Sequence, residues 1–290
     1  MLRNQIDSLM PTQRVSRRGF IATAVGRGFA AAGLPVTAQT VKTDADGLTA
    51  GEVTVRVGDF RMPVYRAMPE GGTGLPVVLV VSEIFGVHEY IADVARRFAK
   101  LGYLALAPEL FVRQGDAQSY GEIARLLADV VLKVPDAQVM GDLDACVAWA
   151  GANGGDVAKI GITGFCWGGR IAWLFDAHSP AVKAAVAWYG GLVGAPDPLR
   201  PTQPIDLAGK LHGPVLGLYG GDDAGIPLDT VDKMKSALTA GSDAAKRSEF
   251  VIYPDTPHAF HADYRPSYRQ AAAEDGWKRC IAWFKAHGVA

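Results

Sequence analysis

The stretch that decides the fold runs from Lys159 to Gly169 and reads KIGITGFCWGG. Its first half, Lys159 to Thr163, alternates and contains β-branched residues, which is typical of a short buried strand. The sequence from Arg170 to Ala177 is apolar and is typical of the start of a helix. Cys166 lies between them, with a glycine two positions away on each side. The stretch therefore predicts a strand, a sharp turn centred on a cysteine, and a helix.

A G-x-C-x-G turn between a strand and a helix is similar to the nucleophile elbow of α/β hydrolases, with cysteine in place of the usual serine. The central residue of such an elbow has a strained backbone, and a side chain two positions away on either side would collide with the neighbouring turn. Gly164 and Gly168 fit this requirement, so Cys166 is the candidate nucleophile.

Strands and helices are expected to alternate along the rest of the chain. Strands are expected at Glu52–Val57, Met62–Ala67, Leu75–Ser82, Tyr103–Ala107, Lys183–Tyr189, Val215–Tyr219 and Ser248–Tyr253, and helices at Tyr90–Leu101, Gln118–Leu132, Ala137–Ala152, Leu228–Leu238 and Tyr268–His287. This order favours an α/β-hydrolase fold with a mostly parallel, doubly wound sheet, helices on both faces and an N-terminal antiparallel hairpin. We predict one domain over residues 51–290, with residues 192–212 as an irregular excursion near the mouth of the site.

The composition is that of a globular protein, with 49% hydrophobic and 20% charged residues. A formal net charge of -1 gives no sign of affinity for nucleic acid or for anionic membranes. No uninterrupted apolar run is long enough for a transmembrane span, and no stable membrane association is expected. The three cysteines indicate neither a disulfide scaffold nor a zinc site, so no metal or cofactor is expected. Cys146 and Cys280 fall on the apolar stripes of predicted helices and are expected to be buried.

The N-terminus resembles a twin-arginine export signal. Arg17 and Arg18 precede a weakly apolar stretch from Ala22 to Leu34, and Val36-Thr37-Ala38 is a small-residue cleavage site. Arg27 departs from the pattern, and the alternative is a disordered tail. We predict an export signal over residues 1–38, a flexible lead-in over residues 39–50, the twin-arginine export machinery as a partner of the precursor, and a periplasmic location. Without a working signal the protein would be cytoplasmic.

A nucleophile of this kind needs a histidine base and an acid, each on a loop that follows a strand. Asp222 and Asp223 follow the strand that ends at Tyr219, and His258 and His261 follow the last strand. The chain order of nucleophile, acid and histidine matches the hydrolase template. From the residues alone, either aspartate could be the acid and either histidine could be the base.

The sequence resembles the dienelactone hydrolase (carboxymethylenebutenolidase) family from about residue 52 to the C-terminus. The resemblance rests on GFCWGG at residues 164–169, SEIFG at 82–86, APELF at 107–111, GGDDAGIP at 220–227 and PHAF at 257–260. In the family the acid lies four residues before a proline, which selects Asp223, and the histidine precedes a small and an aromatic residue, which selects His258. The resemblance implies a Cys-His-Asp triad that cleaves a lactone or ester through a thioester.

The resemblance also implies an oxyanion hole formed by the backbone N–H groups of Ile84 and Trp167. It implies that Glu83 holds the resting thiol of Cys166 and takes its proton once a substrate carboxylate enters. A free thiol has a pKa of about 8.5, so such a switch would limit oxidation between turnovers.

Substrate-binding residues are expected among arginines and aromatics near these motifs. Ala262 occupies the position where the family has an arginine after the histidine, which leaves Arg265 as the candidate there. Arg113 and Arg125 are candidates for a second arginine, with solvated surface side chains as the alternative. Phe85, Trp167 and Phe260 are expected to line an apolar pocket, with core packing as the alternative.

The leading function is therefore hydrolysis of a small lactone or ester. An exported ligand-binding protein without turnover is the second hypothesis, and loss of a triad member would favour it. A thiol-redox protein is the third, but the chain has no C-x-x-C motif. The sequence makes no prediction of oligomeric state.

Overall fold

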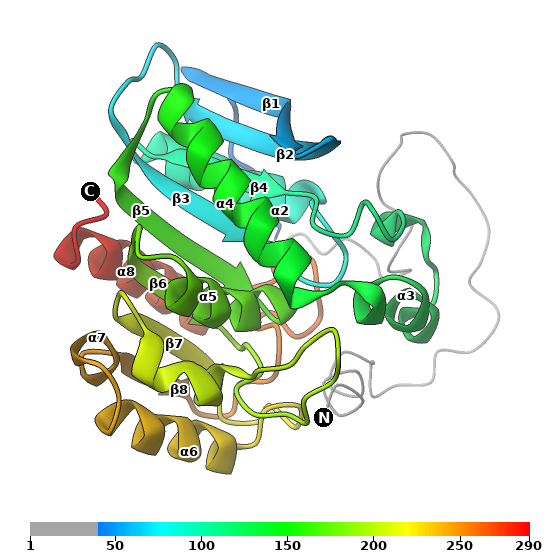
Figure 1. Cartoon of the computed structure of the whole chain (residues 1–290), viewed down its shortest axis with the longest axis vertical. Coiled ribbons are helices and arrows are strands. Elements are labelled where there is room, and N and C mark those ends of the chain that lie inside the picture. Colours follow the sequence, from blue (N-terminus) through cyan, green and yellow to red (C-terminus); the bar gives the residue numbers. More distant parts are fainter. Residues whose placement is uncertain (1–39) are drawn as a thin grey trace.

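The computed structural model describes residues 40–290, so the predicted export signal lies outside the described residues. Eight strands form one sheet in the order β1-β2-β4-β3-β5-β6-β7-β8 (Figure 1). The strands are β1 (Leu48–Val57), β2 (Phe60–Pro69), β3 (Leu75–Val81), β4 (Leu104–Pro108), β5 (Gly155–Phe165), β6 (Val182–Trp188), β7 (Val215–Gly220) and β8 (Glu249–Tyr253). β1, β2 and β4 pair antiparallel, and the pairs from β4 to β8 are parallel.

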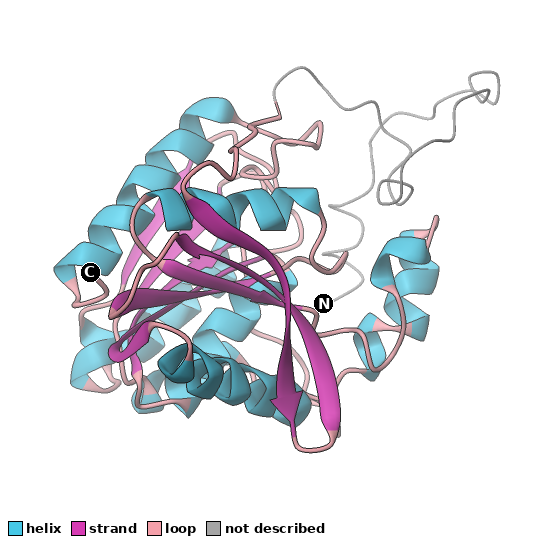
Figure 2. Ribbon diagram, turned by 90° about the horizontal axis from the view of Figure 1, so that it is seen from above, coloured by secondary structure: helices cyan, strands magenta, loops and turns pink. Residues whose placement is uncertain are grey.

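Helices cover both faces of this twisted sheet (Figure 2). They are α2 (Glu89–Lys100), α3 (Ile123–Asp129), α4 (Asp136–Ala152), α5 (Trp167–His178), α6 (Leu228–Thr239), α7 (Asp243–Lys246) and α8 (Gln270–Ala286). Figure 1 shows α4 and α5 in front of the sheet and α2 and α8 behind it. The rings of Phe98 on α2 and Trp277 on α8 pack with their centroids 4.7 Å apart, which joins the two rear helices.

The central strands are apolar on both faces because both faces are covered. In β3, the run from Val77 to Val81 is completely buried, and β4 is buried along its whole length. The predicted α/β-hydrolase architecture, including the N-terminal hairpin that turns at Gly58 and Asp59, is confirmed.

One predicted helix is wrong. Instead of a continuous helix over Gln118–Leu132, the chain forms a 3₁₀ turn at Ala117–Ser119, then α3, then a 3₁₀ turn at Val131–Lys133. Tyr120 is extended and is followed by Gly121, a residue that disfavours helix by about 1 kcal/mol. The short helix α7 and a 3₁₀ turn at Pro204–Lys210 were not expected.

The described part of the predicted lead-in, residues 40–50, makes hydrogen bonds to the rest of the domain. β1 already begins at Leu48. The backbone N–H of Val41 donates to Asp263 at 3.0 Å, and Arg96 on α2 donates to the carbonyl of Thr43 at 2.7 Å. The partners are Arg96 on α2 and Asp263 in the loop after β8, which the sequence pattern does not relate to this segment.

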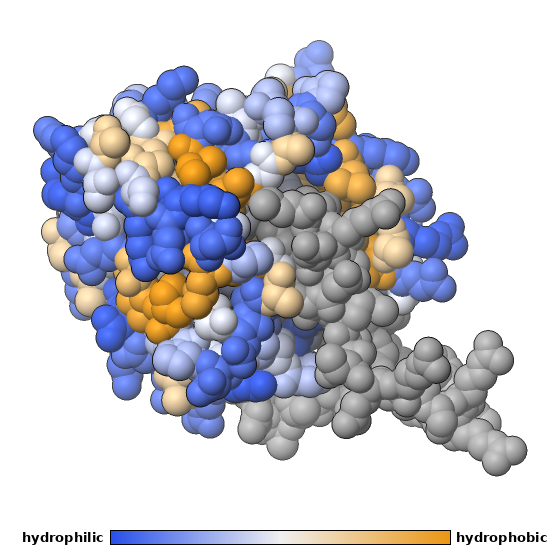
Figure 3. Space-filling view, turned by 90° about the horizontal axis from the view of Figure 1, so that it is seen from below, coloured by the Kyte–Doolittle hydropathy of each residue, from blue (hydrophilic) through white to orange (hydrophobic). Residues whose placement is uncertain are grey.

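Within residues 40–290, no helix is both long and apolar enough to cross a membrane. The face seen from below in Figure 3 is mainly hydrophilic, with smaller hydrophobic areas between the polar side chains.

Candidate active site

Cys166 lies in the turn between β5 and α5 with a backbone that L-residues rarely adopt. Its φ is 55° and its ψ is -114°. The strand and helix approach so closely here that a Cβ on Gly164 would lie 2.0 Å from the carbonyl oxygen of Gly168. A Cβ on Gly168 would lie 2.4 Å from the carbonyl oxygen of Val81 on β3. The two glycines are therefore required for the turn, and the strain falls on Cys166, as is common at functional sites.

A buried carboxylate–imidazole pair comes from the loops after β7 and β8. Nδ1 of His258 lies 2.6 Å from Oδ2 of Asp223, and neither side chain is exposed. Asp223 also accepts from the backbone N–H of Gly225 at 2.9 Å, which fixes its orientation. Asp222, by contrast, is exposed. Parallel strands bring these loops to one edge of the sheet, where the carboxyl ends of β5, β7 and β8 meet.

The other histidine of the C-terminal loop has a different partner. Nδ1 of His261 lies 2.6 Å from the hydroxyl of Tyr90 on α2. Burial, with a smaller effect from Arg97, lowers the pKa of His261 well below its ordinary value, so its ring is neutral. Its imidazole packs against Phe165 and Trp188, beneath the elbow.

His258 is electrostatically coupled to Cys166. Burial alone would lower the pKa of His258, but the negative charges of Cys166 and Asp223 outweigh it and raise the pKa to about 10. Cys166 and His258 are therefore close enough to interact electrostatically, as a nucleophile and its base require.

Two backbone amides near Cys166 are available to a ligand. Among the described residues, neither the N–H of Ile84 nor that of Trp167 donates a hydrogen bond to the protein. Trp167 is the first residue of α5, and the first amides of a helix have no partner within it. The loop that carries Ile84 is held by Glu109, whose carboxylate accepts from the N–H of Val87 at 2.9 Å.

Glu83 is buried beside this loop but is bonded elsewhere than we expected. Its Oε2 accepts a hydrogen bond from the hydroxyl of Tyr264 at 2.7 Å and lies 3.5 Å from Nε2 of His88. Among the described residues it makes no hydrogen bond to Cys166, and its Oε1 has no partner. Burial tends to raise the pKa of Glu83, but the nearby His88, Arg265 and Tyr264 hold it below the ordinary value. The carboxylate is therefore ionised.

The candidate substrate-binding residues separate into two groups. Arg265 is buried, and its guanidinium lies 5.5 Å from the centre of the Phe85 ring. Burial would lower the pKa of Arg265, but electrostatic interactions with Tyr264, Glu83 and Cys166 raise it. These two residues therefore lie together near Cys166.

The remaining three are not brought to the site. Arg113 makes two hydrogen bonds to the buried Asp142, at 2.6 and 2.7 Å, and stacks on Phe60. The side chain of Arg125 on α3 is 73% exposed. Phe260 is completely buried and packs on core aromatics, which is the alternative that the sequence left open.

Sequence reasoning missed His88, Tyr189 and Tyr264. His88 lies two residues after the SEIFG motif and Tyr264 six residues after His258, so closeness to the motifs was the available signal. Tyr189 follows β6 with a φ of 39°, and its ring packs edge-on against His258 with centroids 5.1 Å apart. All three are aromatic side chains, which ordinary core packing also explains.

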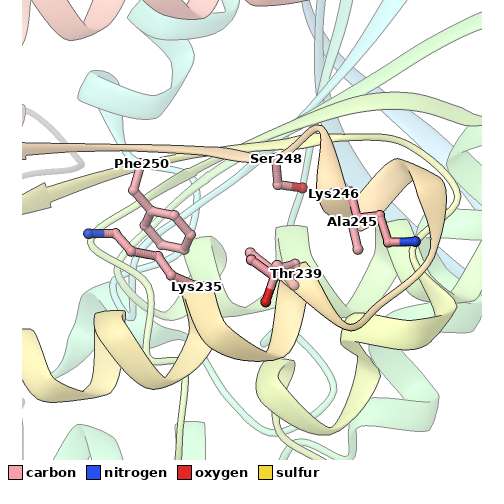
Figure 4. A pocket seen from close by; sticks show the side chains of 7 residues that line it. Lys235, Thr239, Ala245, Lys246, Ser248 and Phe250 are labelled. Atoms are coloured by element: carbon pink, nitrogen blue, oxygen red, sulfur yellow. The ribbon is translucent and has the colours of Figure 1, made fainter.

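A surface pocket of about 530 Å³ lies between α6, α7 and β8 and contains none of these residues (Figure 4). Each of its two lysines is near an aspartate of its own helix, Lys235 with Asp232 at 3.4 Å and Lys246 with Asp243 at 3.7 Å. Among residues 40–290, no three His, Cys, Asp or Glu side chains are grouped so that they could hold a metal ion.

Comparisons with known proteins agree with the geometry. Residues 62–288 match the model of the dienelactone hydrolase family. The chain is 59% identical over 287 residues to a "putative carboxymethylenebutenolidase" of Methylorubrum extorquens, with 98% of each chain covered. It is 52% identical over 269 residues to the protein of that name in Escherichia coli K12, covering 92% of this chain and 98% of the relative. The crystal structure of a "putative dienelactone hydrolase" from Klebsiella pneumoniae superposes with a TM-score of 0.79 at 53% identity, covering 82% of this chain and 98% of that one. The chain belongs to the dienelactone hydrolase family, and it is a carboxylic ester hydrolase with the α/β-hydrolase fold.

Proposed function

We propose that the protein cleaves small lactones or esters through a Cys166–His258–Asp223 triad and a thioester intermediate. The observation that carries this proposal is the buried His258–Asp223 pair, in which Nδ1 of His258 lies 2.6 Å from Oδ2 of Asp223. The pKa of His258 is also raised by Cys166, which lies in the strained elbow. Asp223 fixes the tautomer and orientation of the imidazole, as the acid of such a triad does.

The reaction begins with attack of the Cys166 thiolate on the carbonyl carbon of the substrate. The carbonyl oxygen becomes an oxyanion, which the N–H groups of Ile84 and Trp167 bind. The C–O bond to the leaving group then breaks, and the His258 imidazolium donates its proton to the departing alkoxide or enolate. A lactone opens in this step, and an ester releases its alcohol. Neutral His258 next removes a proton from water, the hydroxide attacks the thioester, and the acid product leaves with Cys166 again a thiolate.

Replacement of the nucleophile tests this function. Cys166→Ala should lower the rate of hydrolysis of aryl esters and dienelactone by at least about 10³-fold, because no other thiol replaces the nucleophile. Cys146→Ala is the matched control, since Cys146 is equally a buried cysteine but lies on α4. Parent-like hydrolysis by Cys166→Ala would overturn the proposal.

We further propose that residues 1–38 direct export by the twin-arginine machinery and that the enzyme works in the periplasm. The support is the sequence pattern of paired arginines, a weakly apolar stretch and the small residues that end at Ala38. N-terminal sequencing of the protein from a periplasmic fraction should give a start after Ala38. A start at Met1 in that fraction would rule out cleavage there.

A further inference from the structure

The turn at residues 109–111, which follows β4 directly, contacts the supports of both candidate oxyanion donors. Oε1 of Glu109 accepts a hydrogen bond at 2.9 Å from the backbone N–H of Val87, in the loop that carries Ile84. The ring of Phe111 packs against the ring of Trp167, the other donor residue, with centroids 4.7 Å apart. One short segment therefore lies against both sides of the place where the oxyanion would form.

The two donor amides differ in how firmly their own segments fix them. Trp167 follows the elbow, where a Cβ on Gly168 would lie 2.4 Å from the carbonyl oxygen of Val81, so its backbone has no room to shift. Ile84 instead lies in the loop between the end of β3 and the start of α2. Gly86 turns this loop sharply, with a φ of 72°. The position of the Ile84 amide therefore depends on contacts from outside its loop.

Those contacts converge on Val87 and the glycine before it. The Val87 N–H donates to Glu109, and the Val87 carbonyl accepts from Nε2 of Gln118 at 3.2 Å. The second oxygen of Glu109 lies against Gly86, where a Cβ would be 2.8 Å from Oε2. Burial raises the pKa of Glu109, and the bond from Val87 opposes that shift, as a hydrogen bond to a carboxylate does. The carboxylate thus holds two successive residues of the loop.

The 109–111 turn is itself anchored to the sheet and to a helix. The backbone N–H of Glu109 donates to the carbonyl of Pro63 on β2 at 3.0 Å. The carbonyl of Leu110 accepts from the side chain of Gln138 on α4 at 3.4 Å, and Phe111 is completely buried. Glu109 therefore extends from a fixed point at the end of β4.

We propose that Glu109 is a positioning residue that sets the place of the Ile84 amide relative to that of Trp167, with Gln118 as its helper on the carbonyl side of Val87. Glu109 acts through the loop and not on the substrate. Displacing a donor by about 1 Å weakens its bond to the developing oxyanion and costs rate. This inference rests on the proposed function, in which both amides bind that oxyanion.

Two reactions of the same thiol separate this role from a general one. Ester hydrolysis forms an oxyanion, whereas iodoacetamide alkylates Cys166 by loss of iodide from a saturated carbon and forms none. Glu109→Ala should lower kcat for an aryl ester at least about tenfold and change KM less than about threefold. Its rate of Cys166 alkylation, followed by mass spectrometry, should stay within about twofold of the parent. Glu109→Gln keeps an acceptor for the Val87 N–H and should recover most of the loss in kcat.

Gln118→Ala gives the same comparison without removing a charge. It should lower kcat at least about threefold with alkylation unchanged, and it decides the question if Glu109→Ala does not fold. The matched control for Glu109→Ala is Asp176→Ala, because Asp176 is also a buried carboxylate that accepts backbone N–H groups, those of His212 and Gly213. The control should lose stability and keep the parent kcat.

The inference is overturned by a parent-like kcat in folded Glu109→Ala, or by equal losses of hydrolysis and alkylation in that variant. A Glu109→Gln variant as slow as Glu109→Ala would also overturn it, because the acceptor oxygen would then not be what matters. Failure of the proposed function is recognised separately, by hydrolysis that survives in Cys166→Ala. Loss of hydrolysis in Cys166→Ala with a parent-like Glu109→Ala would keep the triad and remove the positioning role alone.

Discussion

The backbone N–H of Cys166 donates a hydrogen bond to the carbonyl oxygen of Trp188 at 3.0 Å. This bond ties the elbow to the end of β6, and the next residue, Tyr189, packs against His258. The nucleophile and its base are thus both supported by one strand end, although neither belongs to that strand. A strained φ occurs at both Cys166 and Tyr189, so the strain of the site is shared between two adjacent strands.

The acid of the triad is distinguished from its neighbour by substitution. Asp223→Asn should lower kcat by about 10²- to 10⁴-fold, because an amide can stabilise the wrong tautomer of His258 and cannot stabilise its positive charge. The matched control is Asp222→Asn, since the Asp222 side chain is exposed. Its backbone N–H donates a hydrogen bond to the carbonyl oxygen of Thr256, and the substitution leaves that bond in place. Steady-state hydrolysis of an aryl ester measures both. Equal losses in the two variants would contradict the assignment.

The pairing of His258 with Asp223 predicts a pH dependence of stability. The pKa of folded His258 is about 10, above the ordinary 6.5, so its charged form stabilises the folded state. This stabilisation is fully present below about pH 6.5 and is lost as the pH rises towards about 10. Asp223→Asn removes a main cause of the raised pKa, so its free energy of unfolding should fall less over that window than that of the parent. Urea unfolding at several pH values measures the difference, and parallel curves would refute the effect of the pair.

The elbow and the order of its partners could be predicted because they depend on short-range pattern. Glycine spacing around Cys166 and the loops after two strands are visible in the sequence itself. The roles of Arg113 and Phe260 could not be predicted, because each is decided by a residue distant in sequence: Asp142 for the arginine, and Trp188 among others for the phenylalanine. The orientation of Glu83 depends on Tyr264, 181 residues away, so no local pattern specifies it.

Close packing at the elbow predicts a large loss of stability on adding one methyl group. In Gly168→Ala the new Cβ would lie 2.4 Å from the carbonyl oxygen of Val81 and 2.6 Å from that of Ser82, so backbone must move. Destabilisation of about 3 kcal/mol or more is expected. Gly141→Ala on α4 is the control, since nothing lies within 4 Å of its Cβ and alanine favours helix by up to about 1 kcal/mol. Thermal unfolding of the two variants should shift in opposite directions, and equal shifts would contradict the packing argument.

Arg113 should affect stability rather than substrate binding. Its guanidinium pairs with Asp142, whose side chain is completely buried, and burial raises the pKa of that carboxyl although Arg113 opposes the shift. Arg113→Gln leaves Asp142 without its partner, and the expected loss is about 3 kcal/mol of unfolding free energy with KM unchanged. Asp142→Asn in the same chain should recover part of that loss, because the unpaired charge is gone.

Arg265→Gln, beside Cys166, should instead raise KM for a carboxylate-bearing ester. Denaturant unfolding and steady-state kinetics on the same preparations separate the two effects. A raised KM in Arg113→Gln with unchanged stability would return Arg113 to the substrate site that the sequence suggested.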